Sequence, residues 1–122
     1  MVVRVLVVDD QPAFLRAMVA VVTETPGFVV VGRAGSGEHA LEVAAESGPD
    51  LVLMDVNLPG MDGLAATRRL RAGAPAPVVL LLSTYDEDAG AQFVTASGAA
   101  AYLPKSTLGP DRLLELWSAA AP

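Results

Sequence analysis

The sequence predicts a doubly wound α/β domain: a five-stranded parallel sheet in the order 2-1-3-4-5, with helices on both faces. Uninterrupted apolar runs alternate with helical patterns five times along the chain. Apolar runs of this kind are typical of strands that are buried on both faces, as in parallel sheets. Right-handed crossovers then place helices on both sides of the sheet. The length of 122 residues suits one such domain with a single core.

The elements follow in chain order. Strands are expected over 2–8, 28–33, 51–55, 78–83 and 101–105, and helices over 12–23, 38–47, 64–71, 88–97 and 110–120. Pro12 suits a first helical turn, where a missing N–H costs no hydrogen bond. Asp62 is expected to cap the third helix. Pro104 lies inside the last strand, which places that strand at an edge of the sheet.

The composition argues against several classes of protein. Hydrophobic residues make up 52% of the chain and charged residues 18%, which argues against disorder. A net charge of −6 argues against direct binding to nucleic acid, and the lack of cysteine removes thiol chemistry. The sequence has no stretch typical of a bilayer span and no signal-peptide pattern at its start. We therefore expect a cytoplasmic protein without a membrane partner.

Polar side chains gather where the predicted strands end. They are Asp9 and Asp10 after the first strand, Asp55 on the third, Ser83 and Thr84 on the fourth, and Lys105 on the fifth. Ligands of doubly wound sheets bind beyond the carboxyl ends of the strands. Carboxylate oxygens suit Mg²⁺, and a lysine can neutralise a phosphoryl oxygen. The sequence therefore predicts a magnesium site equipped for phosphoryl transfer.

Other interpretations of the same residues stay open at this point. The aspartate pair alone can be a solvated strand end that caps the next helix. The run GSGEHA at 35–40 matches a dinucleotide-binding turn, but it follows the second strand instead of the first. A phosphatase with an aspartyl nucleophile would carry D-x-D on the first strand, where this chain has Asp9, Asp10 and Gln11. His39, the only histidine, begins a helix and is expected to be solvated.

Taken together, the motifs resemble the receiver domain of bacterial two-component response regulators. They are VVDD at 7–10, MDVNLPGMDG at 54–63, LST at 82–84 and YLPK at 102–105, and they span essentially the whole chain in order. The runs GAAAYLPKS at 98–106 and LSTYDED at 82–88 are most similar to the NarL/FixJ subfamily. The resemblance implies a flavodoxin-like fold and one receiver domain over residues 1–122.

The resemblance also implies a metal site and a nucleophile. Asp55 would be the phosphoacceptor that attacks the phosphorus of a phosphohistidine on a sensor histidine kinase. Asp10, Asp55 and the backbone carbonyl of Asn57 would bind Mg²⁺ directly, and Asp9 would hold it through water.

Three further residues match the part of the family motif that contacts or reads the phosphoryl group. Lys105 would pair with the phosphoryl group, and the Ser83 hydroxyl would donate a hydrogen bond to it. Tyr102 would move inward behind Ser83, so that the two residues form the switch. Ser106 follows Lys105 where most receivers have a proline joined by a cis bond, and a cis bond before serine would cost about 3 kcal/mol.

The implied function is a switch that catalyses its own phosphorylation and dephosphorylation, and not a metabolic enzyme. NarL/FixJ regulators act on transcription through a LuxR-type helix-turn-helix domain, so DNA would be contacted only through such a domain, which this chain lacks. The alternative is a stand-alone receiver that acts by protein contact.

Two hypotheses concern association and stability. Helices 12–23 and 110–120 carry more apolar residues than one buried stripe requires. We therefore expect a homodimer through the first helix, the fifth helix, or the face made by the fourth helix, the fifth strand and the fifth helix. The carboxylates are expected to cost stability without metal and to raise the pKa of at least one of them.

Overall fold

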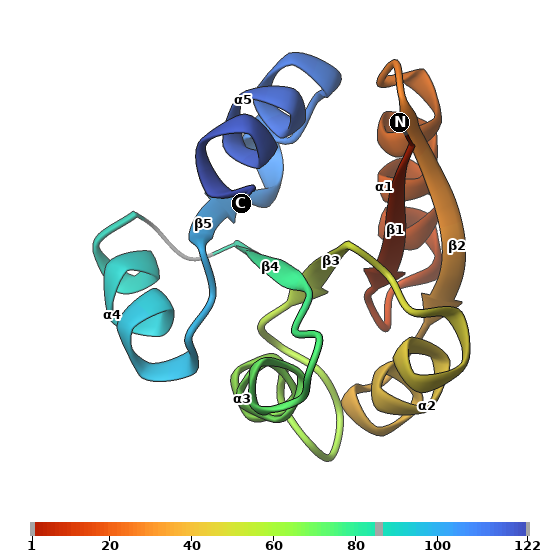
Figure 1. Cartoon of the computed structure of the whole chain (residues 1–122). Helices are drawn as coiled ribbons and strands as arrows, with labels where there is room; N and C mark the ends of the chain where they lie inside the picture. The colour runs from red at the N-terminus through yellow and green to blue at the C-terminus, as the bar shows by residue number, and fades with distance from the viewer. Residues whose placement is uncertain (1, 85–86, 122) are drawn as a thin grey trace.

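The computed structural model describes residues 2–84 and 87–121. Within them, five parallel strands form a sheet in the order β2-β1-β3-β4-β5, which confirms the predicted doubly wound fold. The strands are β1 (Val3–Val8), β2 (Phe28–Ala34), β3 (Leu51–Asp55), β4 (Val78–Ser83) and β5 (Ala101–Pro104). The helices are α1 (Pro12–Glu24), α2 (Gly37–Ser47), α3 (Gly63–Ala72), α4 (Glu87–Ser97), the short 3₁₀ helix η1 (Lys105–Thr107) and α5 (Pro110–Ala120). Figure 1 shows α1 and α5 on one face of the sheet and α2, α3 and α4 on the other.

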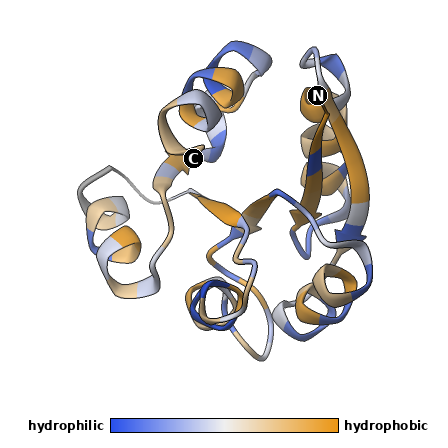
Figure 2. Cartoon of the chain, in the orientation of Figure 1, coloured by the Kyte–Doolittle hydropathy of each residue, from blue (hydrophilic) through white to orange (hydrophobic). Residues whose placement is uncertain are grey.

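Each face of the sheet has its own apolar core, because successive residues of a strand point to opposite faces. Leu6 and Leu81 are fully buried in the core that includes residues of α2, α3 and α4. Val5 and Leu80 are buried in the core that includes residues of α1 and α5. Figure 2 shows the strands as largely hydrophobic ribbons between helices of mixed hydropathy. The polar residues at the strand ends are therefore exceptions within an apolar sheet.

The ends of the last strand and of α4 differ slightly from the expected ones. α4 begins at Glu87, one residue early, and β5 stops at Pro104 because Lys105 opens η1. β5 is an edge strand next to β4, as Pro104 predicted. Among the described residues the only cis peptide bond is Ala74–Pro75, so the bond between Lys105 and Ser106 is trans.

Within the described residues, two helices begin at side-chain caps. Oδ1 of Asp62 accepts a hydrogen bond of 2.8 Å from the backbone N–H of Ala65, which confirms the predicted cap of α3. Oγ of Ser36 accepts a hydrogen bond of 3.1 Å from the backbone N–H of His39 at the start of α2. His39 itself is exposed, as expected.

The glycine-rich turn before α2 packs against the loop that follows β3. A Cβ atom on Gly37 would lie only 2.5 Å from the carbonyl oxygen of Met61. The Glu38 carboxylate accepts a hydrogen bond of 3.3 Å from the backbone N–H of Met61. Close packing between two loops therefore accounts for the glycine that had suggested a dinucleotide-binding turn.

The expected surplus of exposed apolar residues on α1 is not observed. Met18 and Val22 are fully buried, and Phe14, Leu15, Val19 and Val21 are half-buried against the same core. α1 buries this wide arc because it contacts β1, β2 and α5 at once. The large apolar residues that are exposed among the described residues are Val2, Val29 and Leu114, and of these only Leu114 lies on a helix.

Two further observations bear on the sequence-based expectations. No helix within the described residues is long and apolar enough to cross a membrane. The LSTYDED run at 82–88 includes Tyr85 and Asp86, which lie outside the described residues.

Candidate functional site

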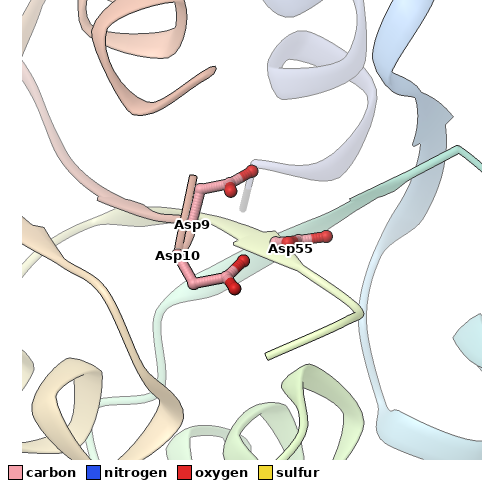
Figure 3. A group of neighbouring side chains, drawn as sticks. All are labelled: Asp9, Asp10 and Asp55. Carbon is pink, nitrogen blue, oxygen red and sulfur yellow. The ribbon is translucent and has the colours of Figure 1, made fainter. Parts of the chain in front are cut away.

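Three carboxylates converge where two adjacent strands end. Asp9 and Asp10 follow β1, and Asp55 is the last residue of β3, which pairs with β1. One oxygen of each carboxylate lies within 4.8 Å of the others. Figure 3 shows the three side chains gathered at this edge of the sheet. The predicted acidic cluster is therefore present in the folded chain.

Asp9 is the buried and most fully paired member of the cluster. Its side chain is 0% exposed, and Oδ1 accepts a hydrogen bond of 2.8 Å from the backbone N–H of Gln11. Oδ2 lies 2.8 Å from Nζ of Lys105 and has no hydrogen-bond partner among the described residues besides this ion pair. The Gln11 contact holds the chain as it turns from β1 into α1. Asp9 therefore has both a structural contact and a charge partner.

Lys105 brings a positive charge to the cluster from the edge strand. Its Nζ lies 3.6 Å from Oδ2 of Asp55, in addition to the shorter contact with Asp9. The same Nζ lies 4.4 Å from the centre of the Phe14 ring, which comes from the first turn of α1. The Lys105 side chain is only 12% exposed. The ammonium is therefore held among two carboxylates and an aromatic ring.

Asp55 is the group whose ionisation the site perturbs. Its side chain is 3% exposed, and Oδ1 accepts a hydrogen bond of 3.3 Å from the backbone N–H of Asn57. Burial, and then the neighbouring Asp9 carboxylate, raise the pKa of Asp55 to about 6, although Lys105 acts in the opposite direction. The expectation that the cluster raises the pKa of at least one member is met at Asp55.

The loop after β3 turns back closely on Asp55. The backbone N–H of Gly63 donates a hydrogen bond of 3.0 Å to the carbonyl oxygen of Val56. A Cβ atom on Gly63 would overlap the carbonyl oxygen of Asp55. Glycine at this position therefore lets α3 start directly against the strand end, which fixes the path of the short loop that contains Asn57.

A cavity of about 210 Å³ lies beside the cluster. Its lining residues are Asp10, Gln11, Asp55, Asn57, Thr84 and Lys105. Asp10 is exposed, unlike Asp9 and Asp55. When all four groups are ionised, the three carboxylates and the one ammonium carry a net charge of −2. A hard divalent cation such as Mg²⁺ fits this set of oxygen ligands, because it prefers carboxylates, a carbonyl and water.

The two hydroxyls at the end of β4 differ in position. Ser83 is fully buried, whereas Thr84 is exposed and lines the cavity. The Tyr102 hydroxyl donates a hydrogen bond of 3.4 Å to the backbone carbonyl oxygen of Ser83. The Tyr102 ring is half-buried, and its centre lies 6.1 Å from that of Phe93. Tyr102 therefore packs between α4 and the end of β4.

The structure brings together residues that the sequence analysis did not assign to the site. Gln11 lines the cavity, and Phe14 contacts Lys105. Gln11 directly follows Asp10, so its position just after a strand end was a usable signal. Phe14 gave no such signal, because nothing in its local pattern distinguishes it from an ordinary core residue of α1.

Comparison with known proteins finds a matching protein family and similar sequences. Residues 5–117 match the family described as response regulator receiver domain. The chain is 41% identical over 103 residues to the response regulator GacA of Pseudomonas viridiflava, which is 84% of this chain and 48% of that protein. It is 37% identical over 108 residues to a protein-glutamate methylesterase/protein-glutamine glutaminase of Myxococcus xanthus, which is 88% of this chain and 31% of that protein.

A solved structure of a response regulator is similar to this one. A two-component response regulator of the LuxR family from Aurantimonas sp. SI85-9A1 has a similar structure, with a TM-score of 0.86 and 30% identity. The match covers 98% of this chain and 84% of that one. By contrast, the chain spans only 48% and 31% of the length of the two curated relatives.

Proposed function

Because the chain belongs to the family of response regulator receiver domains, we propose that Asp55 accepts a phosphoryl group from a sensor histidine kinase in the presence of Mg²⁺. The observation that carries the proposal is the position of Asp55, which is buried beside Lys105 and near two further carboxylates. A nucleophile, a cation and a set of metal ligands thus border one cavity.

In the proposed reaction, a carboxylate oxygen of Asp55 attacks the phosphorus of a phosphohistidine. The new O–P bond forms as the P–N bond breaks, and the imidazole keeps the electron pair of that bond and takes up a proton. Only the ionised carboxylate is a nucleophile, and a pKa of about 6 leaves most of Asp55 ionised near neutral pH. Lys105 neutralises charge on the phosphoryl oxygens during the transfer.

The reverse half of the cycle uses water. A water oxygen attacks the phosphorus of the aspartyl phosphate, the O–P bond to Asp55 breaks, and the carboxylate is restored together with inorganic phosphate. We propose that the chain catalyses these two steps on itself and turns over no metabolic substrate.

The proposed metal site uses the ligands that the cavity offers. When bound, Mg²⁺ neutralises phosphoryl oxygens and orients the group in transfer. Asp10, Asp55 and the backbone carbonyl of Asn57 would hold it directly. Asp9 would act through water, because Oδ1 already accepts a hydrogen bond from Gln11 and Oδ2 already pairs with Lys105.

We further propose that Ser83 and Tyr102 read the phosphoryl group. The Ser83 hydroxyl would donate a hydrogen bond to a phosphoryl oxygen. The Tyr102 hydroxyl contacts the backbone carbonyl of Ser83 at 3.4 Å, so a shift at the end of β4 reaches β5 directly.

The direct test is phosphorylation by a small acyl phosphate or phosphoramidate. Intact-mass measurement is expected to find one phosphoryl adduct on the wild type with Mg²⁺. The adduct is expected to be lost in chelator and in Asp55→Asn. Asp62→Asn is the matched control, because it makes the same substitution outside the carboxylate cluster and outside this cavity, and asparagine keeps a capping side chain.

Two results would contradict this assignment. An adduct that persists in Asp55→Asn means that another residue is the acceptor. Steady release of inorganic phosphate without a labelled intermediate means that the chain acts as a phosphatase instead.

We propose transcription as the output, through a LuxR-type DNA-binding domain. The similarity to a response regulator of the LuxR family supports this output. The methylesterase relative favours regulation of a catalytic domain as the second candidate. A stand-alone receiver is the third. Reading the natural gene beyond the codon for Pro122 distinguishes them: a helix-turn-helix sequence, a catalytic domain, or a stop codon.

We also propose that the chain forms a homodimer. The exposed Leu114 favours α5, or the face made by α4, β5 and α5, over α1, whose large apolar side chains pack inward. Sedimentation with and without a phosphate mimic is the test. A monomer at high concentration in both states would rule the dimer out.

A further inference from the structure

The Lys105 ammonium has an aromatic contact in addition to its two carboxylate contacts. Nζ lies 4.4 Å from the centre of the Phe14 ring, 2.8 Å from Asp9 and 3.6 Å from Asp55. At this separation, the negative face of an aromatic ring attracts a cation, and more so where water is scarce. The Lys105 side chain is only 12% exposed, so the contact is largely shielded.

The fold brings these residues together from opposite ends of the chain. Phe14 is the third residue of α1, and α1 starts just after the Asp9–Asp10 pair. Lys105 follows β5, at the edge of the sheet. The body of the Phe14 ring is half-buried against the core that α1 and α5 share. The ring is therefore anchored by the core while it contacts the ammonium.

A lysine needs such an anchor to act at a defined point. Its side chain is long and flexible, and its ammonium is a strongly hydrated point charge. The contact with Asp9 is shorter than the contact with Asp55, so the carboxylates alone draw the ammonium toward Asp9. The Phe14 ring adds a second attraction to the ammonium. Because the ring carries no formal charge, it neither takes a proton from Lys105 nor repels the phosphoryl group.

We propose that Phe14 is a positioning residue for Lys105. Its ring helps to hold the Lys105 ammonium beside Asp55, where the incoming phosphoryl group needs a positive charge. This inference rests on the proposed function of Asp55. The cavity beside the cluster is lined by Lys105 and Asp55, and Phe14 acts on the reaction only through the lysine.

The test compares two substitutions of the ring. Phe14→Leu keeps an apolar side chain in the core but removes the aromatic face, whereas Phe14→Tyr keeps the face. We expect Phe14→Leu to lower the second-order rate constant of phosphorylation by a small phosphodonor by about two- to fivefold. Phe14→Tyr is expected to react at close to the wild-type rate.

Phe28→Leu is the matched control. Phe28 is half-buried in the same core, but its ring packs edge-on against Trp117 at 6.3 Å between centres instead of contacting Lys105. It is expected to leave the phosphorylation rate unchanged. Equal slowing in Phe28→Leu and Phe14→Leu would mean that core packing, and not the ring on the lysine, controls the rate, and would overturn the proposal.

A second readout needs no phosphorylation. Lys105 is the only lysine in the sequence, so protein labelled at lysine gives a single set of side-chain NMR signals. The Hε protons are expected upfield in the wild type and in Phe14→Tyr, because of the ring current, and at the ordinary position in Phe14→Leu. An unshifted wild-type signal overturns the contact.

The two proposals fail in different ways. A wild type that forms no adduct on Asp55 ends the proposed function and this inference with it. Normal adduct formation, with Phe14→Leu as fast as the wild type, overturns the inference alone.

Discussion

Lys105 pairs with Asp9 through a contact of 2.8 Å, and this ion pair gives Asp9 a different environment from its neighbour Asp10. Asp9 is buried with a cation beside it, whereas its neighbour Asp10 is exposed. The pair offsets the cost of burying the first carboxylate, but Asp10 adds only repulsion when no metal is bound. The two neighbours should therefore respond in opposite directions when their charge is removed.

The first prediction compares Asp9→Asn with Asp10→Asn in chelator. Asp9→Asn breaks a buried ion pair and is expected to lower the free energy of unfolding by about 1–3 kcal/mol. Asp10→Asn removes an exposed like charge and is expected to raise it by about 0.5–1 kcal/mol. Urea unfolding of the three proteins at one pH is the measurement.

Added Mg²⁺ supplies the control for this comparison. The wild type is expected to gain stability in proportion to saturation of the site, and Asp10→Asn is expected to gain little because a ligand is missing. If the free energy of unfolding of Asp10→Asn in chelator is lower than that of the wild type, then Asp10 has a structural role and the repulsion argument is wrong.

The second prediction concerns the close approach of α3 to β3. Gly63→Ala places a methyl group onto the carbonyl oxygen of Asp55, which is backbone and cannot move aside. We expect a loss of about 1–3 kcal/mol in the free energy of unfolding. In Gly73→Ala the new Cβ would lie 3.6 Å from the carbonyl oxygen of Leu70, an ordinary van der Waals contact, so this variant should change stability by less than about 1 kcal/mol. Similar losses in both variants would contradict the close-approach argument.

Much of this architecture follows from local sequence signals. Apolar strands without alternation imply a sheet covered on both faces, and that sheet brings all strand ends to one edge. This reasoning predicts that Asp9, Asp55 and Lys105 lie together. Pro104 and Asp62 were equally predictable, because a missing donor and a capping carboxylate each have few places in a fold.

The remaining features depend on packing between distant segments. The contact between Phe14 and Lys105 joins the first helix to the last strand, and no short-range pattern encodes it. The large apolar side chains of α1 pack inward because the helix contacts both α5 and the sheet. The number of apolar residues in its sequence therefore overstated its exposed apolar surface. The role of Gly37 in close packing likewise depends on the position of Met61, which is distant in the sequence.

The third prediction concerns the packing of Tyr102 against α4. A Cβ atom on Gly90 would overlap the Tyr102 ring, so Gly90→Ala must displace the ring. Glycine to alanine inside a helix normally stabilises by about 1 kcal/mol. Here we expect a net loss of about 1–2 kcal/mol instead, because overpacking outweighs helix propensity. Urea unfolding measures the loss, and weaker NOEs between Phe93 and Tyr102 should accompany it.

A double variant tests the cause of that loss. With Tyr102→Ala already in place, which removes every side-chain atom of residue 102 that the new Cβ would overlap, Gly90→Ala is expected to lose its penalty and to recover the helical gain. An equal penalty in both backgrounds would show that the ring is not the obstacle.

The fourth prediction follows from the pKa of about 6 at Asp55, against an ordinary value of 3.8. Between these two values the folded state binds more protons than the unfolded state, so the stability of the wild type falls as the pH rises. The penalty is absent below about pH 4 and complete above about pH 6–7, where it is worth about 1–3 kcal/mol. Asp55→Asn cannot ionise at this position and has no such penalty.

Unfolding of both proteins in chelator across this pH range is the measurement. Asp55→Asn is expected to be the more stable protein at pH 7, and its advantage is expected to shrink steadily as the pH is lowered. Mg²⁺ should narrow the difference at pH 7, because it binds the ionised carboxylate in the wild type and stabilises the folded state by mass action. A stability difference that does not change with pH would mean that Asp55 ionises in the folded protein as it does in the unfolded chain, and that burial and Asp9 do not perturb it.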